Sequence, residues 1–465
     1  MNSVGTYRAH PLDAKLAALL PPGSLFAVGG RVRDELRADL EGLNLPTKDL
    51  DYVVTGTELE ELRARLQPAG RVDLVGASFA VLKVTLGDVT VDVALPRRER
   101  STGAGHRDFE VQAGPSVSLR EDLGRRDFRM NMIARALPSG ELVDPFGGGA
   151  DIRARRIDIL KPQAFEEDPL RMLRAAQFAA RFDYAVSEAT RAAMVAFAPA
   201  IGSVSFERVA DELSKLLALS RRPSVGLELM RETGLLAAIW PELLEGYGVE
   251  QNEWHAFDVY HHALATVDAA PGGNLILRLG ALFHDVGKPR TKEGPHFYGH
   301  ELVGEALARA MLARVRFSNQ TVDTVAHLVR QHMYAADPAL SDAAIRRFIR
   351  RIGPEHLQAQ FALRLADSIG SGLPRRDGGN AAFEARVWAE IERKPAFSVL
   401  DLAIDGDDAV RLMIDKGLAP RAFRGDERIG RALRWLFEQV TERPERNERT
   451  CLLALLDEYF DAQSA

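Results

Sequence analysis

Two aspartates, Asp49 and Asp51, lie one residue apart in the stretch Asp49–Val54, whose composition is typical of a β-strand. Side chains two positions apart in a strand share a face, so both carboxylates are expected on the same side of a sheet. Neighbouring carboxylates are the oxygen ligands that Mg²⁺ prefers, and metal clamps of this kind stabilise the attacking and leaving oxygens in phosphoryl transfer. Asp92, in the predicted strand 89–94, supplies a third carboxylate. We therefore predict Asp49, Asp51 and Asp92 as catalytic residues, with Mg²⁺ held by Asp49 and Asp51.

A Gly-Gly turn precedes these aspartates. Gly29 and Gly30 end a short apolar run that begins at Leu25, and Arg33 lies where the first turn of a helix is expected. Glycine lets backbone N–H groups approach a phosphate closely, and the positive end of a helix dipole favours an anion. The turn therefore predicts a site for the phosphates of a nucleotide, to which Gly29, Gly30 and Arg33 contribute.

Five motifs in a fixed order extend this pattern. They are Gly29–Asp34, Lys48–Asp51, Arg125–Asn131, Asp144–Asp151 and Glu167–Arg174. With them the chain resembles the class II nucleotidyltransferases of the DNA polymerase β superfamily, which include bacterial CCA-adding tRNA enzymes and poly(A) polymerases. Arg129 and Met130 stand where this family usually has Thr and Ile, whereas the charged residues of that motif are kept. The resemblance implies nucleotide binding by Arg125, Arg126, Asp127 and Asn131.

The last of these motifs carries Asp168, Arg171 and Arg174, whose spacing is that of neighbours on one helix face. An aspartate acceptor beside an arginine donor complements an amino group next to a ring-nitrogen acceptor, the pattern on the pairing edges of cytosine and adenine. Uracil and guanine present a carbonyl next to an N–H instead. The resemblance assigns this base-reading role to Asp168 and Arg171 and directs Arg174, with one of Arg125 or Arg126, toward the triphosphate. It thus implies template-independent addition of C and A from CTP and ATP to the 3′ end of tRNA.

The stretch Arg97–Phe109 lies between Asp92 and the motif Arg125–Asn131, and it contains Gly and Ser residues that imply mobility. In the family, the corresponding loop is linked to the switch from C to A addition, so its presence favours full CCA synthesis. An A-adding or CC-adding specialist and a poly(A) polymerase share the motifs and stay open as alternatives. Poly(A) polymerases usually carry a basic C-terminal extension, whereas this chain ends with the acidic stretch Asp457–Asp461.

Histidine is concentrated in one part of the chain, because eight of the eleven histidines lie between His255 and His332. Imidazole and carboxylate groups brought together by helices suit a divalent transition metal such as Ni²⁺, Mn²⁺ or Zn²⁺ and can leave a position open for water. The arrangement resembles the HD metal-dependent phosphohydrolases. This resemblance implies a metal held by His262, His284, Asp285 and Asp367, with His300 and His332 as candidate further ligands.

A nucleotidyltransferase head followed by an HD domain is similar to the enterobacterial CCA-adding enzymes, whose HD domain hydrolyses 2′,3′-cyclic phosphates and 2′-nucleotides. A secondary phosphohydrolase or phosphatase activity is therefore expected. In the reverse alternative, HD hydrolysis is the main activity and the head only binds RNA or nucleotide, which the filled aspartate positions disfavour. Three further histidines of this region, His255, His296 and His327, are given no role.

The predicted secondary structure that must position these residues changes along the chain. Residues 1–150 mix strands and helices and include a hairpin of strands 81–86 and 89–94. Beyond about residue 160, apolar residues recur at helical spacing. We predict an α/β head with a DNA polymerase β-like nucleotidyltransferase sheet, followed by a mostly α-helical neck, HD body and tail. The expected boundaries are 1–150 for the head, 151–220 for the neck, 221–372 for the HD body and 381–465 for a tRNA-binding tail.

The composition limits the remaining function classes. The chain has 465 residues, of which 46% are hydrophobic and 27% charged, values that exclude disordered and fibrous proteins. Its single cysteine, Cys451, excludes an internal disulfide. Because no apolar run approaches the roughly 20 residues of a membrane helix, we expect a cytoplasmic protein without a membrane partner. The net charge of −6 conceals arginine-rich stretches such as 345–376, which suit tRNA as a partner.

Overall fold

The computed structural model describes residues 7–46, 50–75, 80–101, 109–374 and 380–464. The chain divides into two compact units, and each is described by itself. The first unit comprises residues Met1–Val249, Pro271–Leu279 and Arg309–Val322. The second comprises residues Glu250–Ala270, Gly280–Ala308 and Asp323–Ala465.

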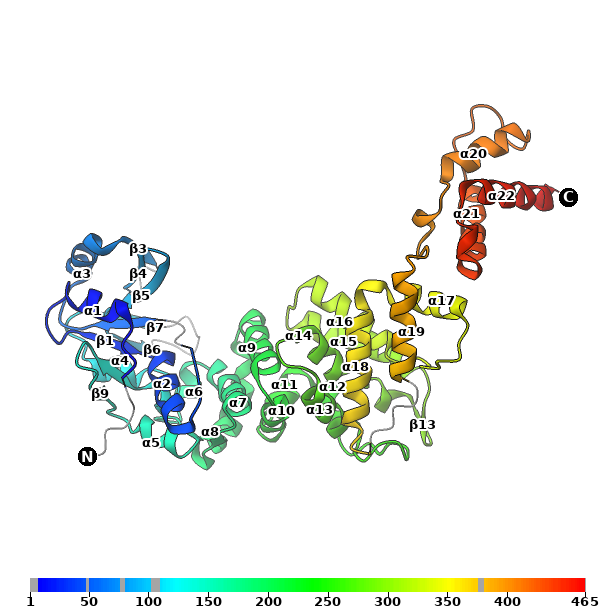
Figure 1. Cartoon of the computed structure of the whole chain (residues 1–465). Coiled ribbons are helices and arrows are strands. Elements are labelled where there is room, and N and C mark those ends of the chain that lie inside the picture. The colour runs from blue at the N-terminus through cyan, green and yellow to red at the C-terminus, as the bar shows by residue number, and fades with distance from the viewer. Residues whose placement is uncertain (1–6, 47–49, 76–79, 102–108, 375–379, 465) are drawn as a thin grey trace. The chain divides into compact units, whose positions relative to one another are not determined.

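A seven-stranded mixed sheet forms the core of the head in the first unit (Figure 1). In spatial order its strands are β3 (Arg71–Val75), β4 (Val81–Leu86), β5 (Val89–Ala94), β2 (Asp51–Val54), β1 (Leu25–Val28), β8 (Ala134–Ala136) and β9 (Leu142–Val143). The β2–β5 pair is parallel and every other neighbouring pair is antiparallel. The α/β head and the hairpin of β4 and β5 are thereby confirmed.

The parallel pair brings two predicted carboxylates together. Asp51 is the first residue of β2, and its partner across the pair is Asp92 in β5. Residues paired across neighbouring strands point to the same face of a sheet, so both side chains project from one face. This juxtaposition arises because the chain leaves β2, passes through α3 (Leu59–Leu66) to β3 at the edge of the sheet and returns through β4, so that β5 pairs with β2, which no local sequence pattern specifies. Asp49 lies outside the described residues.

Five helices accompany the sheet. They are α1 (Pro11–Ala17), α2 (Gly30–Glu41), α3 (Leu59–Leu66), α4 (Leu119–Gly124) and α5 (Gly148–Arg153). Helix α1 is fixed to α2 by a buried ion pair, in which the Arg31 guanidinium donates to both oxygens of Asp13 at 2.8 and 2.6 Å. Burial by itself would raise the pKa of Asp13, but the hydrogen bonds from Arg31, His10 N and Tyr52 together lower it. Glu35 extends the cluster by accepting from both Arg31 and Arg135, at 2.9 and 3.1 Å.

The stretch predicted as a loop between residues 97 and 109 is in part a hairpin. Strands β6 (Arg97–Ser101) and β7 (Phe109–Ala113) pair antiparallel, with Arg97 opposite Ala113. Residues 102–108 lie outside the described part of the chain. The alternation of apolar and polar residues in Phe109–Ala113 could have indicated β7, whereas β6 contains only polar residues and gave no such signal.

Helices make up most of the rest of the first unit. They include α6 (Ala164–Glu167), α7 (Leu170–Phe182), α8 (Glu188–Phe197), α9 (Phe206–Leu219), α10 (Pro223–Glu232), α11 (Leu235–Ile239) and α12 (Pro241–Leu244). Short strands β10 (Arg156–Ile157) and β11 (Ala185–Val186) add a parallel pair. Helices α7 and α10 approach closely at Gly226, where a Cβ atom would lie 2.6 Å from the carbonyl oxygen of Ala176.

The helices that follow carry the histidine cluster. They are α13 (Val259–Ala269), α14 (Leu275–Phe283), α15 (His300–Arg314), α16 (Asn319–Gln331), α17 (Asp342–Ile352), α18 (Leu357–Gly370) and α19 (Asn380–Glu392), and β12 (Lys292–Glu293) pairs with β13 (His296–Phe297). Helices α13 and α18 pack without a side chain between them at Gly370. A Cβ atom there would lie 2.2 Å from the Thr266 hydroxyl oxygen and 2.7 Å from its backbone nitrogen.

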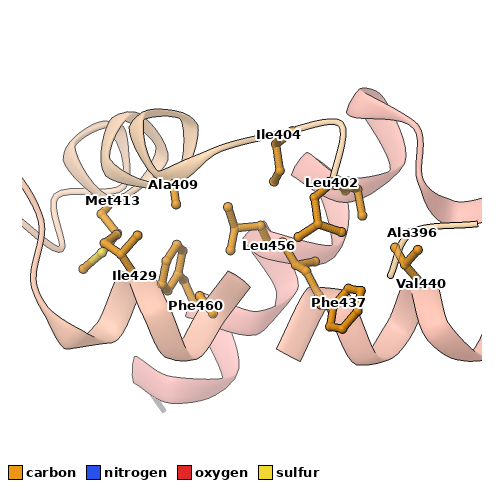
Figure 2. Packing of buried hydrophobic residues seen from close by; sticks show 13 residues of the cluster. Ala396, Leu402, Ile404, Ala409, Met413, Ile429, Phe437, Val440, Leu456 and Phe460 are labelled. Atoms are coloured by element: carbon orange, nitrogen blue, oxygen red, sulfur yellow. The ribbon is translucent and has the colours of Figure 1, made fainter. Parts of the chain in front are cut away.

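The last three helices enclose a separate apolar core. They are α20 (Gly406–Asp415), α21 (Glu427–Glu442) and α22 (Arg449–Ser464). Figure 2 shows buried side chains from all three helices, among them Met413, Phe437 and Phe460, packed together. Helix α19 belongs instead to an aromatic core with α17 and α18, to which it contributes Phe383 and Val387. Among the described residues, no helix combines the length and apolar character needed to cross a membrane.

The buried cluster around Arg31 generates a stability prediction. Asp13→Ala leaves the Arg31 charge without its bidentate partner, and we expect a loss of about 3–5 kcal/mol in the free energy of unfolding. Urea unfolding followed by circular dichroism measures this loss. Arg65→Ala, which removes the exposed Arg65–Glu61 pair, is the matched control and should cost no more than about 1 kcal/mol. Equal losses in the two variants would contradict the importance of the buried pair.

Candidate functional site

A hollow of about 640 Å³ in the first unit gathers the predicted nucleotide-binding residues. It is lined by Gly29, Gly30, Arg33, Asp51, Arg125, Arg126, Asp127, Asn131, Asp168, Arg171 and Arg174, together with residues that the sequence analysis did not identify. These residues come from β2, from the turn before α2, from the segment after α4 and from α7. Elements far apart in sequence thus converge on one arginine-rich site.

Gly29 makes a close approach possible. Its φ of +73° is in the left-handed region, and a Cβ atom would lie 3.1 Å from Arg126 Nη1 and 3.6 Å from Asp51 Oδ2. The turn therefore brings a carboxylate and a guanidinium to the start of α2, where unpaired backbone N–H groups favour an anion. Asp92 does not line the hollow but lies beside Asp51 in the sheet. The neighbouring carboxylates have the oxygen chemistry that fits a divalent cation.

Asp122 orients the arginine pair and was not identified from the sequence. Its buried carboxylate accepts from Arg125 Nη2 at 2.8 Å and from Arg126 Nη2 at 3.3 Å. Burial alone would raise the pKa of Asp122, but the charges of Arg125 and Arg126 lower it, so the carboxylate stays ionised. Its position three and four residues before the two arginines was the available signal, because such residues are neighbours on a helix.

Asp127 lies at the centre of a chain of hydrogen bonds that joins three elements. Its Oδ1 accepts from Asn131 Nδ2 at 2.8 Å, and its Oδ2 accepts from Arg174 Nε at 2.9 Å. Asn131 in turn accepts from Arg33 Nη1 at 2.9 Å. Burial opposes ionisation of Asp127, but the Arg174 charge and the hydrogen bonds from Asn131 and Phe128 N together lower the pKa. Asp127 and Asn131 therefore hold Arg33 and Arg174 at fixed positions on the wall of the hollow.

The predicted pairing of Asp168 and Arg171 on one helix face is wrong. Asp168 has an extended backbone, with φ −145° and ψ 97°, and α7 begins only at Leu170. Pro169 is the reason, because the residue before a proline is disfavoured in the helical region. The Asp168 carboxylate instead accepts from Leu170 N at 3.2 Å and from Arg208 Nη2 at 2.9 Å.

Arg171 is fixed separately and still lines the same hollow. Its Nη2 donates to the carbonyl oxygen of Arg125 at 2.6 Å, and its Nη1 donates to the carbonyl oxygen of Ala164 at 3.2 Å. The acceptor and the donor predicted to read a base are therefore both present, but each is held by tertiary contacts and not by the other.

Further residues that line the hollow lie at helical spacing along α7 and α9. On α7, Gln177, Phe178 and Arg181 follow Arg174 at spacings of three, four and seven residues, which place them on one face of the helix. On α9 the same face pattern is formed by Arg208, Glu212 and Lys215, and Arg97 at the start of β6 completes the set. Neither helix stood out in the sequence, because its charged face is indistinguishable from a solvated one until a partner surface is known.

The second unit brings all six predicted HD-site residues into one cluster. His262 lies in α13, His284 and Asp285 directly follow α14, and Asp367 lies in α18. His300 is the first residue of α15, and His332 directly follows α16. The ligand atoms of His262, His284 and Asp367 lie within 4.8 Å of one another, as do those of Asp285, His300 and His332. The four histidines and Asp285 are buried.

The four histidines share one orientation. Each ring places Nδ1 against a backbone carbonyl oxygen, of Gly370 for His262, Ala281 for His284, Phe297 for His300 and Val329 for His332. A neutral ring that donates from Nδ1 leaves Nε2 as an acceptor, the arrangement that metal-binding histidines adopt. The Nε2 atoms nevertheless face each other at 3.1 Å in two pairs, His262 with His284 and His300 with His332. Two ring nitrogens this close must share a proton or a metal ion, and this set of imidazole and carboxylate groups fits a divalent metal.

Asp285 lies between the two histidine pairs. Its Oδ2 is 3.1 Å from His284 Nε2, and its Oδ1 is 3.4 Å from His300 Nε2. Lys288 Nζ contacts Asp285 Oδ2 at 2.6 Å and fixes the carboxylate. Although burial would raise it, the charges of His284 and Lys288 keep the pKa of Asp285 well below its usual value. Burial would lower the pKa of His284, but Asp285 and Asp367 raise it to about 10, which again reflects a site that attracts positive charge.

His255, which was given no role, also approaches this cluster. Its ring lies edge-on to that of His262, with 4.7 Å between centroids. A ring nitrogen of His255 lies within 4.8 Å of the ligand nitrogen of His262 and the ligand oxygen of Asp285. Burial and the nearby Lys288 charge lower the pKa of His255 to about 4, so the ring is neutral. His296 and His327 are not among the residues of these metal-ligating groups.

Family models of known proteins match three successive segments of the chain. Residues 25–158 match the Poly A polymerase head domain, residues 183–246 the probable RNA and SrmB-binding site of polymerase A, and residues 255–370 the HD domain. The multifunctional CCA protein of Azoarcus sp. (strain BH72) is 34% identical over 411 residues, which cover 85% of this chain and 93% of the relative. The chain belongs to the multifunctional CCA protein family. The predicted nucleotidyltransferase head and the predicted HD domain correspond to the head and HD matches.

Solved structures share the fold. The Bacillus stearothermophilus CCA-adding enzyme in complex with CTP has a TM-score of 0.68 and 23% identity, covering 95% of this chain and 94% of its own. The Thermotoga maritima CCA-adding enzyme in complex with tRNA has a TM-score of 0.57 and 18% identity, covering 97% of both chains. The chain therefore shares the overall fold of these solved structures.

Gly29 allows a direct test of the nucleotide hollow. Gly29→Ala places a methyl group against Arg126, so we expect the KM for CTP to rise about tenfold. Gly23→Ala is the matched control, because Gly23 has a similar φ of +77° but no atom within 4 Å of a built Cβ. Both variants should also lose stability, by about 1–3 kcal/mol, because alanine disfavours a positive φ, so the KM is compared at a temperature where both are folded. Steady-state kinetics checks the difference, and an equal rise in KM in both variants would contradict the role of this approach.

Proposed function

We propose that this protein adds C and A nucleotides from CTP and ATP to the 3′ end of tRNA without a nucleic-acid template. The observation that carries the proposal is the convergence of Asp51, the Gly29-Gly30 turn and the base-reading pair Asp168 and Arg171 on one hollow. Such a hollow has one set of groups for the base of a nucleoside triphosphate and another for its phosphates. Membership of a family whose named members are multifunctional CCA proteins supports the same conclusion.

In this proposal the residues around the turn bind the triphosphate. Arg33, Arg126 and Arg174 offer positive charge, and the start of α2 offers backbone N–H donors. The 3′-hydroxyl of the RNA gives up its proton to a neighbouring carboxylate as its oxygen attacks the α-phosphorus. The bond between the α-phosphorus and the oxygen bridging to the β-phosphorus breaks, and pyrophosphate leaves with that oxygen. Asp49, Asp51 and Asp92 would hold Mg²⁺, which supplies charge neutralisation at the phosphates. The protein contributes mainly position and charge.

Base choice follows from the groups that the hollow presents. Asp168 accepts from the exocyclic amino group of cytosine or adenine, and Arg171 donates to the adjacent ring nitrogen. Uracil and guanine would direct a carbonyl oxygen at Asp168 and an N–H at Arg171, so both contacts become unfavourable. Because Arg208 and the carbonyl oxygen of Arg125 fix this pair, the protein edge keeps its polarity without a template base.

The remaining segments are assigned accordingly. We propose a head at 1–150, a neck with the base-reading residues at 151–220, an HD body at 221–372 and a tRNA-binding tail at 381–465. The match of residues 183–246 to an RNA-binding family supports a role of the neck in holding RNA. We place the reaction in the cytoplasm, where tRNA, CTP and ATP occur together.

A second activity is supported by the histidine cluster. We propose that the HD domain hydrolyses phosphate esters such as 2′,3′-cyclic phosphates and 2′-nucleotides. His262, His284 and Asp367 would hold a divalent transition metal such as Ni²⁺, Mn²⁺ or Zn²⁺, with Asp285 shared between it and a second ion at His300 and His332. A metal at this position supplies a water of lowered pKa and polarises the phosphate. The uniform Nδ1–carbonyl contacts of the four histidines are the observation that favours this activity.

The transfer reaction is tested with three tRNA substrates, ending before CCA, after the first C and after CC, each with CTP and ATP separately and together. We expect full CCA on the shortest substrate, read by sequencing the products. A product limited to CC or A, or a long A tail, would replace the proposal by the corresponding specialist or poly(A) polymerase. No incorporation on any substrate would overturn the transferase proposal.

The same assay separates the two activities. Asp51→Ala should reduce nucleotide addition by about a thousandfold or more, because the site loses a carboxylate that would hold Mg²⁺ against the charge of the phosphates. Hydrolysis of 2′,3′-cyclic phosphate should be unchanged. His284→Ala should give the reverse pattern. Loss of both activities in either variant would contradict two independent sites.

Metal content gives a readout that does not depend on activity. We expect two transition-metal ions per chain by mass spectrometry, one after His300→Ala and a lowered Tm after chelation, because a bound metal stabilises the folded state. His296→Ala is the matched control, since His296 lies in β13 outside the metal-ligating groups. A wild-type chain that binds no ion at saturating Ni²⁺, Mn²⁺ or Zn²⁺ would refute the site.

A further inference from the structure

His255 lies beside the HD cluster, although none of the motifs includes it. Its side chain comes from the segment 250–256, which lies outside helices and strands. The ring packs edge-on against His262, and a ring nitrogen lies within 4.8 Å of the ligand atoms of His262 and Asp285. A fifth imidazole therefore reaches the group of side chains that fits a divalent metal.

The hydrogen bonds of Asn252 fix the tautomer of His255. Asn252 Oδ1 accepts from the backbone N–H of Trp254 at 3.2 Å, which identifies this atom as the amide oxygen. The same oxygen lies 3.0 Å from His255 Nδ1, so Nδ1 carries the proton and donates it. Nε2 then keeps its lone pair. The four other histidines of the cluster make the same Nδ1 contact with backbone carbonyl oxygens, which is how metal-binding histidines are oriented.

Hydrogen bonds on both sides of His255 hold its segment against the cluster. Lys288 Nζ, which also contacts the Asp285 carboxylate, donates to Gln251 Oε1 at 2.6 Å. The backbone N–H of Ala256 donates to the carbonyl oxygen at residue 371, directly after α18. The segment is thus tied to the stretch that follows α14 and to the end of the helix that carries Asp367. The position of the His255 ring is therefore fixed by elements that also supply metal ligands.

The Asp285 carboxylate has an acceptor that a cation would satisfy. Asp285 Oδ2 is buried and accepts no hydrogen bond from the described residues, because the 2.6 Å approach of Lys288 Nζ lacks hydrogen-bond geometry. A buried acceptor without a donor costs free energy unless another positive group meets it. Oδ2 lies 3.4 Å from His262 Nε2 and 3.1 Å from His284 Nε2. An ion that satisfies Oδ2 therefore also meets both imidazoles.

The distances fit one ion with His255 as a further ligand. The Nε2 atoms of His262 and His284 are 3.1 Å apart, and each lies 3.0 to 3.6 Å from an oxygen of Asp285 and of Asp367. With metal–ligand bonds of about 2.1 Å, neighbouring ligands are about 3.0–3.4 Å apart and opposite ligands about 4.2 Å. We call the ion that these four residues would hold the first ion. The 4.8 Å limit that includes His255 is only slightly longer than the separation of opposite ligands.

We propose that His255 binds the first ion through Nε2, as a fifth protein ligand that lies outside the HD motif. Three imidazoles and two carboxylates suit a divalent transition metal, and a six-coordinate ion has one position left for water. Asp367 keeps 36% of its side chain exposed, so that position can be reached from solvent. Asn252 orients the ring from behind. This inference rests on the metal site of the proposed function and adds a ligand to it.

Metal affinity tests the inference without reference to activity. In the full chain carrying His300→Ala, the proposed site keeps only the first ion, and its Kd for Ni²⁺ is measured by competition with a chelator. Adding His255→Ala should raise this Kd by about a hundredfold or more, because loss of a mere outer partner already costs roughly 10–100-fold. His261→Ala is the matched control and should leave the Kd unchanged, since His261 is half-exposed and outside the metal-ligating groups of the described residues.

Co²⁺ and added imidazole distinguish a ligand from a packing contact. The absorption bands of bound Co²⁺ depend on the number and type of its ligands, so His255→Ala should change them at saturating Co²⁺. Free imidazole should restore both the bands and the Kd, because it can occupy the space that the ring leaves. If His255→Ala lowers the Tm of the metal-free chain, Asn252→Ala replaces it. That variant keeps the ring and should raise the Kd about tenfold.

An unchanged Kd together with unchanged Co²⁺ bands would overturn the inference. So would a raised Kd with wild-type bands and no rescue by imidazole, since His255 would then only support the fold of its segment. A wild-type chain that binds no ion at saturating metal would instead overturn the proposed metal site. The two failures are therefore distinguishable.

Discussion

The buried charge of Asp127 is the constraint on which the head site depends. A carboxylate removed from water must be paired, and Arg174 of α7 and Asn131 provide its partners. Since Asn131 also holds Arg33, one hydrogen-bonded chain fixes α2, the short helix at Arg129–Asn131 and α7. The residues that would bind phosphates and those that would read the base therefore keep one geometry. Preorganisation of this kind matters most in a reaction where the protein supplies mainly position and charge.

The histidine cluster obeys a related constraint with the opposite sign. Its buried Nε2 atoms and carboxylate oxygens are acceptors, so the cluster needs a cation, whereas Asp127 is a buried anion that brings its own guanidinium. Backbone contact between α13 and α18 at Gly370 makes this density of ligands possible. Gly370 also supplies the carbonyl oxygen that orients His262, so helix packing and ligand orientation have a common origin.

Local patterns predicted the elements but failed where a neighbour decided the backbone. Strands β1, β4 and β5 and the turn before α2 follow from apolar runs and glycines, and the structure confirms them. The helical pairing of Asp168 and Arg171 failed because Pro169 forces an extended residue before α7. Asp122 and Arg208 were missed because their spacings are common on solvated helices. Only their contacts with Arg125, Arg126 and Asp168 distinguish them.

The sequence by itself determined the family, the residue types of both sites and the order of head and helical parts, because motif spacing and periodicity are local properties. Tertiary structure decided which of those residues meet. Asp51 faces Asp92 only through a crossover in the sheet, and Asp285 lies between two histidine pairs only because α13, α15, α16 and α18 converge. The approach of His255 to this cluster left no motif at all. Its segment lies outside helices and strands, so only hydrogen bonds to other parts of the fold place the ring beside His262 and Asp285.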